Sequence, residues 1–131
     1  MVFGTFDVLH KGHLDFFLQA RKLSKNPFLV VSVARDVNVK KIKGKKPLRS
    51  EKERLASIQE LLLADKVVLG GLKSYLPHIM KEKPAIIALG YDQKAYVDNL
   101  KSELSKKGLK PRIVRLKAYK SHIYKSSLLK K

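Results

Sequence analysis

The chain of 131 residues contains no cysteine. This absence excludes disulfide bonds, thiolate zinc sites, iron–sulfur ligation and cysteine nucleophiles, and it fits a reducing compartment. No apolar stretch approaches the roughly 18 residues that a membrane-spanning helix needs. The N-terminus does not resemble a secretory signal, because its short apolar run meets Asp7 at once. We therefore expect a single domain over residues 1–131, located in the cytoplasm and without a membrane partner.

Acidic residues are also scarce, since 11 Asp and Glu stand against 29 Lys and Arg and the formal net charge is +18. A field of this size attracts the phosphates of nucleotides, nucleic acids or anionic lipids, although a lysine-rich solvated surface would look the same. No helix-turn-helix, zinc-finger or RNA-recognition signature is present, so nucleic acid is not the expected partner. One short stretch is especially basic and contains Lys40, Lys41, Lys43, Lys45 and Lys46.

Short apolar runs alternate with segments of helical spacing along the chain. The predicted strands are Val2–Phe6, Phe28–Ala34, Lys66–Leu69, Ala85–Leu89 and Pro111–Leu116. The predicted helices are Gly12–Leu23, Ser50–Leu63, Leu72–Lys81 and Gln93–Lys107, and residues 35–49 are expected to be a polar loop. This order predicts an α/β fold, namely a three-layer Rossmann-like domain with a five-stranded parallel sheet and helices on both faces.

Two helix boundaries are marked by their residues. Ser50 followed by Glu53 is a capping box, in which the hydroxyl and the carboxylate each accept a backbone N–H at the start of a helix. Gly108 stands where a C′ glycine would end the helix before it. These signals predict where the second helix begins and where the last helix stops.

Ligands of parallel sheets bind beyond the carboxyl ends of the strands, where the strand order reverses. The turn after the first predicted strand lies in Gly4–His13, which reads GTFDVLHKGH. Its two imidazoles, His10 and His13, flank Gly12 where a strand passes into a helix. A helix N-terminus attracts phosphate through its backbone N–H groups and partial positive charge. Histidine N–H groups can donate to phosphoryl oxygens, and glycine lets the backbone approach them.

This stretch resembles the signature of the cytidylyltransferase-like nucleotidyltransferases, whose hallmark is His-x-Gly-His after the first strand. Four further segments are similar to archaeal-type FAD synthetases, which are FMN adenylyltransferases: VARDVNV (Val33–Val39), KGKKP (Lys43–Pro47), ADKVVLG (Ala64–Gly70) and IIALGYDQ (Ile86–Gln93). The resemblance extends over residues 2–129. It implies that AMP is transferred from ATP to FMN, giving FAD and pyrophosphate.

The resemblance also implies roles for individual residues. His10 and His13 would contact the triphosphate and stabilise charge on the reacting α-phosphate. Lys43 would act with Lys45 and Lys46 in a basic loop that reaches over the phosphates. The other implied nucleotide contacts are Thr5 and Phe6 through their backbone, Lys11, Gly12, Asp92, Tyr119, Ser126 and Ser127.

The implied reaction is an in-line displacement, in which a phosphate oxygen of FMN attacks the α-phosphorus of ATP and pyrophosphate leaves. Such a transfer needs positioning and charge compensation more than covalent help. A divalent cation such as Mg²⁺ is expected, held mainly by substrate phosphates, because the sequence shows no dedicated cluster of protein ligands. Asp7 is expected to cap its turn rather than to assist that cation.

Several residues near the expected site have two interpretations. Arg35 and Asp36 end the second strand and either belong to the site or form a surface ion pair. Arg54 either matches a recurring arginine of the family or is a solvated side chain. Asp65 is expected to be structural, because it precedes a short buried strand.

Two other functions stay open at this level. The first is a cytidylyltransferase acting on glycerol 3-phosphate or a similar phosphorylated alcohol, although those enzymes usually carry Gly-Asp-Asp where this chain has Gly90-Tyr91-Asp92. The second is a degenerate relative that binds nucleotide or RNA through its charge, which would not require two intact histidines and Gly12. A homodimer is compatible with a small parallel-sheet domain.

Overall fold

The computed structural model describes residues 1–72, 76–90 and 97–118. Its strands are β1 (Val2–Gly4), β2 (Val30–Val33), β3 (Lys66–Leu69), β4 (Ile86–Leu89) and β5 (Arg112–Arg115). Its helices are α1 (Lys11–Arg21), α2 (Asp36–Lys43), α3 (Glu51–Glu60), α4 (Leu76–Glu82) and α5 (Val97–Lys106). The predicted alternation of strands and helices is therefore confirmed.

The strands are parallel, but they form two sheets, one of order β1-β2-β3 and one that pairs β4 with β5. The expected single sheet of five strands is wrong. β4 does lie beside β1, where the amide of Ala88 donates to the Met1 carbonyl at 3.0 Å and the Met1 amino group donates to the Ile86 carbonyl at 2.8 Å. Both bonds fall at Met1, before β1 begins, and such a short contact does not make a ladder.

Across the two sheets the strands lie in the order β3-β2-β1-β4-β5. From β1 the chain adds β2 and β3 on one side and then β4 and β5 on the other, so the strand order reverses between β1 and β4. In an open parallel sheet, the crevice at such a reversal, beyond the carboxyl ends of the strands, is the preferred place for a ligand. The turn that follows β1 therefore lies where a binding site is expected.

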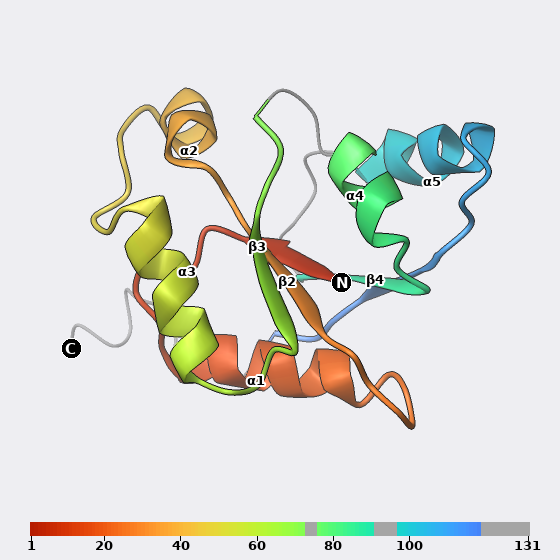
Figure 1. Cartoon of the computed structure of the whole chain (residues 1–131), viewed down its shortest axis with the longest axis horizontal. Coiled ribbons are helices and arrows are strands. Elements are labelled where there is room, and N and C mark those ends of the chain that lie inside the picture. Colours follow the sequence, from red (N-terminus) through yellow and green to blue (C-terminus); the bar gives the residue numbers. More distant parts are fainter. Residues whose placement is uncertain (73–75, 91–96, 119–131) are drawn as a thin grey trace.

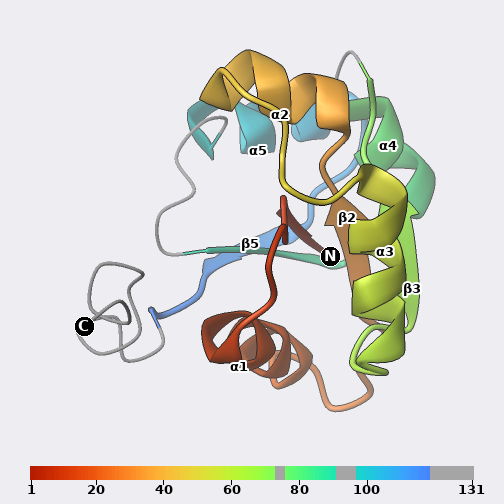
Figure 2. The ribbon, with the colours of Figure 1, turned by 90° about the vertical axis from the view of Figure 1, so that its left-hand side faces the viewer.

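Helices cover both faces of the strands, with α1 on one side and α4 and α5 on the other (Figures 1 and 2). The core beneath α1 and α3 contains Val2, Phe6, Phe17, Leu29, Val31, Val33, Ile58, Ala88 and Leu116. The core beneath α4 and α5 contains Met1, Phe3, Val30, Ile79, Ile87, Leu89, Leu100 and Leu104. Successive strand residues face opposite sides, which is why Val30 and Val31 belong to different cores. No helix in the described part of the chain has the length and apolar character to cross a membrane.

The stretch 35–49, predicted to be a polar loop, contains α2. This helix is mostly polar and buries only Val39, so its sequence alone carries little helical signal. Its first amide, that of Asp36, donates to the Glu51 carboxylate at 2.9 Å, and Gly44 ends it in the left-handed region with φ of 78°. A contact from α3 thus supports a helix that periodicity does not reveal.

The two predicted helix boundaries are confirmed. The Ser50 hydroxyl accepts from the Glu53 amide at 3.2 Å, and the Glu53 carboxylate accepts from the Ser50 amide at 3.1 Å. Gly108 follows α5 with φ of 84°, a conformation that favours glycine.

Replacement of Ser50 by alanine should lower the free energy of unfolding by about 1 kcal/mol, because the Glu53 amide loses its cap. Urea denaturation of both proteins measures the difference. Ser57→Ala is the matched control, since the Ser57 hydroxyl donates to the Glu53 carbonyl within the same helix and alanine favours helix there. Equal losses in the two variants would contradict the capping role.

Candidate active site

The predicted motif lies in the turn between β1 and the start of α1, beside the reversal of strand order. Figure 2 shows the chain leaving β1 and entering α1. The residues that this turn brings together are Thr5, Phe6, His10, Lys11, Gly12 and His13. Lys43 is the last residue of α2 and is exposed. The other predicted contacts, Asp92, Tyr119, Ser126 and Ser127, lie outside the described residues.

The buried side chain of Phe6 fixes the conformation of the turn after β1. Its backbone has φ of 52°, a strained value for a residue with a side chain, and its ring is buried. The ring covers Gly4, where an added Cβ would come within 2.6 Å of it. It also packs edge-on against the His13 ring, with 5.6 Å between centroids, and against Phe17 at 5.2 Å. Burial of the Phe6 ring therefore holds both the strained backbone and His13.

The two histidines cap the helix and contact each other. The Gly12 amide donates to His10 Nδ1 at 3.0 Å, and the His10 amide donates to His13 Nδ1 at 3.2 Å. The ring centroids are 4.0 Å apart. Because the Gly12 amide is taken by His10, the arrangement presents the imidazole edges, rather than this amide, to a ligand.

These hydrogen bonds determine which ring nitrogen carries the proton. A nitrogen that accepts a hydrogen bond has no proton, so each neutral ring is protonated at Nε2. Burial, and then the nearby His10, lower the pKa of His13 from 6.5 to about 4. At neutral pH His13 is therefore an uncharged ring whose Nε2–H is a donor.

Gly12 is required by packing as well as by access to a ligand. A Cβ on Gly12 would lie 2.7 Å from His10 Cε1 and 2.9 Å from His10 Nδ1. The His10 ring thus occupies the space that any other side chain at position 12 would need.

Arg54 connects this turn to the elements around it. Its side chain is fully buried, and its Nη1 donates to the Thr5 carbonyl at 2.7 Å. Its Nε donates to the Arg49 carbonyl at 3.0 Å, and its Nη2 pairs with Asp36 at 2.6 Å. The interpretation of Arg54 as a solvated side chain is wrong. Its spacing of four residues before Ile58 places it on the buried face of α3, which is the sequence signal that would have revealed it.

The carboxylates near the turn accept hydrogen bonds from backbone amides. Asp7 accepts from the amides of Leu48 and Arg49 at 2.8 and 2.9 Å, so it caps a distant segment rather than its own turn. Asp36 accepts from the Glu51 amide at 3.2 Å. Partial burial raises the pKa of Asp36, but hydrogen bonds from Arg54 and the Glu51 amide, with the charges of Arg54 and Lys46, lower it overall.

Arg35 and Asp65 also form ion pairs. Arg35 Nε lies 3.1 Å from a Glu51 carboxylate oxygen, although the alignment is too poor for a hydrogen bond. Asp65 accepts from the Leu29 amide at 2.7 Å and from Arg21 at 2.9 Å, at the amino ends of β2 and β3. The structural role expected for Asp65 agrees with these contacts.

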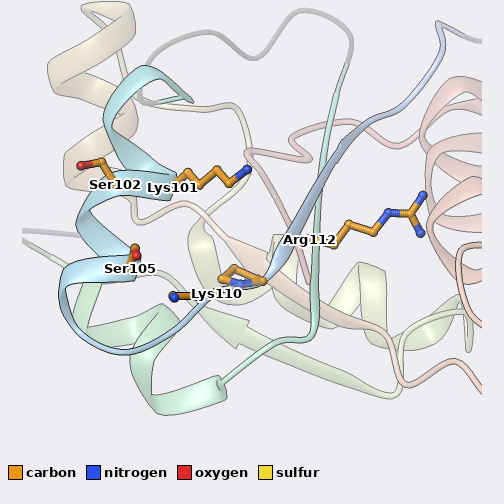
Figure 3. A pocket seen from close by; sticks show the side chains of 6 residues that line it. Lys101, Ser102, Ser105, Lys110 and Arg112 are labelled. Carbon is orange, nitrogen blue, oxygen red and sulfur yellow. The ribbon is translucent and has the colours of Figure 1, made fainter.

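A separate depression of about 660 Å³ is lined by Lys101, Ser102, Ser105, Lys110, Pro111 and Arg112. It lies between α5 and the amino end of β5. The histidines follow the carboxyl end of β1, so the depression is at the opposite end of the strands. The side chains of Ser102 and Arg112 point away from each other (Figure 3). Because its polar groups do not converge, this depression is not the candidate site.

The described residues contain no group of three or more histidines, cysteines or acids that could hold a metal ion. Both Asp7 oxygens accept backbone amides, so this carboxylate is occupied by the protein itself. The side-chain donors of the two histidines at the turn are imidazole N–H groups, which suit phosphate oxygens better than a cation.

The family described as Cytidylyltransferase-like matches residues 1–131. The chain belongs to this family. A crystal structure described as the lipopolysaccharide core biosynthesis protein from Thermoplasma volcanium GSS1 is 40% identical, with a TM-score of 0.83 over 91% of this chain and 95% of that chain. That likeness confirms the Rossmann-like α/β fold of the nucleotidyltransferase.

Curated relatives share one name. An FAD synthase of Methanosarcina barkeri is 44% identical over 113 residues, which are 86% of this chain and 78% of the relative. An FAD synthase of Thermoplasma volcanium is 39% identical over 131 residues, 100% of this chain and 90% of the relative. An FAD synthase of Archaeoglobus profundus is 43% identical over 124 residues, which are 95% of this chain and 77% of the relative.

Substitution of Gly12 by alanine should lower kcat/KM for nucleotidyl transfer at least tenfold, because the new Cβ displaces the His10 ring. The melting temperature should change little, because the helix propensity gained with alanine offsets the loss of the cap that His10 gives to the amide of residue 12. Steady-state kinetics and thermal denaturation of the same preparations measure both effects. Wild-type activity in this variant would show that the His10 ring need not lie against Gly12.

The free energy of unfolding should fall as the pH is lowered from 6.5 toward 4. In this window the unfolded chain protonates His13, whose pKa is then near its ordinary 6.5, whereas the folded chain with a pKa of about 4 does not. Urea denaturation at several pH values measures the slope. His13→Asn removes the titrating group and should flatten the slope, while the contribution of His78 stays in both proteins. Equal slopes would contradict the lowered pKa.

Proposed function

We propose that this cytidylyltransferase-like protein is an FAD synthase, which transfers AMP from ATP to FMN and releases pyrophosphate. Support for the substrates comes from the three relatives of that name, which are 39 to 44% identical over most of the chain. The observation that carries the chemistry is the histidine pair, in which both Nδ1 atoms accept backbone amides and both Nε2–H groups remain as donors.

The reaction is a direct displacement on phosphorus. A phosphate oxygen of FMN forms a bond to the α-phosphorus of ATP, and the bond from that phosphorus to the bridging oxygen of the β-phosphate breaks. The bridging oxygen keeps the electron pair and leaves with pyrophosphate. His10 and His13 donate Nε2–H bonds to the oxygens on which negative charge grows, which stabilises the transition state without a covalent intermediate.

A neutral imidazole suits this role. The pKa of His13 is lowered to about 4, so its ring stays neutral near pH 7. Its Nε2–H then acts as a hydrogen-bond donor of fixed orientation. Because the amides of Gly12 and His10 hold the rings, the donors do not have to reorganise as the reaction proceeds. The partial positive charge at the start of α1 favours the triphosphate at the same place.

Positive charge comes from the lysines after β2. Lys43, Lys45 and Lys46 are exposed, and their ammonium groups would pair with the β- and γ-phosphates. A divalent cation, when bound to the triphosphate oxygens, would neutralise further charge. Thr5, Phe6, Lys11 and Gly12 would line the nucleotide at the turn. Asp92, Tyr119, Ser126 and Ser127, which the sequence resemblance implies as further nucleotide contacts, stay predictions.

The purified protein, incubated with ATP, FMN and Mg²⁺, should form FAD and pyrophosphate in equal amounts, as measured by chromatography and a coupled pyrophosphate assay. Turnover of CTP with glycerol 3-phosphate and none with FMN would favour a cytidylyltransferase instead. Salt-sensitive RNA binding without turnover of any nucleotide would overturn the enzymatic proposal.

Asparagine at position 10 or 13 separates the chemistry of each histidine from its structural role. The Asn Oδ1 takes the place of Nδ1 and still accepts the backbone amide, but no donor replaces Nε2–H. Each variant should therefore keep a melting temperature close to that of the wild type and lose about 100-fold or more in kcat. Activity within a few-fold of the wild type in both variants would remove the histidines from the mechanism.

A further inference from the structure

The lysine segment, residues 43–46, covers the end of α2 and the first residues after it. It lies in the stretch 36–51, the lysine loop, which consists of α2 and the chain that leads to α3, and whose two ends are joined. The Asp36 amide donates to the Glu51 carboxylate at 2.9 Å, and the Glu51 amide donates to the Asp36 carboxylate at 3.2 Å. The starts of α2 and α3 thus cap each other, although they are 15 residues apart in sequence. This reciprocal contact closes the neck of the loop that carries the lysines.

A second contact ties the same loop to the histidine turn. Both oxygens of Asp7 accept successive backbone amides, those of Leu48 at 2.8 Å and Arg49 at 2.9 Å. Asp7 lies three residues before His10. Lys46 lies two residues before Leu48, so its backbone is within about 7 Å of this contact even in an extended chain.

Arg54 completes the junction. It donates to the carbonyl of Arg49 on the loop, to the carbonyl of Thr5 on the turn, and to Asp36 at the neck. A fully buried guanidinium carries a large desolvation cost, which its partners only offset. Such a group is poorly explained by stability alone and well explained by the geometry that it imposes.

Apolar packing contributes little on either side of the lysine segment. Ile42 and Leu48, which flank the lysine segment, have 80% and 86% of their surface exposed. A leucine this exposed contributes little hydrophobic stabilisation to its backbone. In the described part of the chain, the position of Leu48 therefore depends mainly on the hydrogen bonds that the Leu48 and Arg49 amides donate to the Asp7 carboxylate.

We propose that Asp7 and Arg54 are positioning residues, which hold the lysine segment beside the histidine turn so that its ammonium groups meet the β- and γ-phosphates of the bound nucleotide. This inference rests on the proposed function, because it takes the triphosphate to lie at His10 and His13. Neither Asp7 nor Arg54 contacts the nucleotide. Their effect on the reaction passes through the lysines, which carry the charge.

A double-mutant cycle tests this dependence. One side of the cycle is Asp7→Ala, and the other replaces Lys43, Lys45 and Lys46 by glutamine. If Asp7 acts through the lysines, Asp7→Ala should weaken ATP binding and kcat/KM about tenfold in the wild type. In the chain without these lysines it should change either quantity less than twofold. Calorimetric titration with MgATP and steady-state kinetics with FMN give the two readouts.

Asp65→Ala is the matched control. Asp65 also accepts a backbone amide and an arginine N–H, but it lies at the amino ends of the strands, away from the turn. It should lower the melting temperature and leave ATP binding unchanged. Should Asp7→Ala fail to fold, Asp7→Asn enters the same cycle, because its amide keeps one acceptor. Arg54→Lys should weaken ATP binding in the same lysine-dependent way.

Additive losses in the cycle, or unchanged ATP binding in Asp7→Ala, would overturn the positioning role. The readout by ATP binding also separates this inference from the proposed function. A wild-type protein that binds ATP and forms no FAD contradicts the acceptor, while the cycle in ATP affinity still decides the role of Asp7. A wild-type protein that does not bind ATP contradicts both.

Discussion

The buried guanidinium of Arg54 is the contact on which the arrangement at the carboxyl ends of the strands depends. It donates to carbonyls of the turn after β1 and of the chain before α3, and it pairs with Asp36 at the start of α2. A charge without access to water must find its partners in fixed places. Three segments that meet at one such charge cannot move independently. The turn after β1, the start of α2 and the chain before α3 are therefore held in fixed positions relative to one another.

The residues of the histidine motif are required for packing as well as for chemistry. Gly4 makes room for the Phe6 ring, the Phe6 ring supports His13, and Gly12 makes room for the His10 ring. The imidazoles then take backbone amides at Nδ1 and keep Nε2–H for a ligand. Fixed donors therefore lie at the turn, whereas the positive charge comes from exposed lysines at the end of α2 and just after it. Fixed donors provide orientation, and the lysines provide attraction.

Elements whose residues carry their own signal were predictable. β3 has the predicted bounds Lys66–Leu69, and the capping box of Ser50 begins α3 as expected. α2 was not predictable, because it is polar and its first amide is capped by a carboxylate from another helix. The division into two sheets was not predictable either, since no pattern in β1 or β4 tells how many bonds form between them.

Local chemistry in the sequence determined the alternation of strands and helices, the turn that carries the histidines and the family to which the chain belongs, because each depends on neighbours within a few residues. Only the tertiary structure decided that Arg54 is buried, that Asp7 caps amides 41 and 42 residues away, and that His13 is a neutral Nε2–H donor. Burial and long-range hydrogen bonds belong to pairs of segments, and their energies exist only once the chain has brought those segments together.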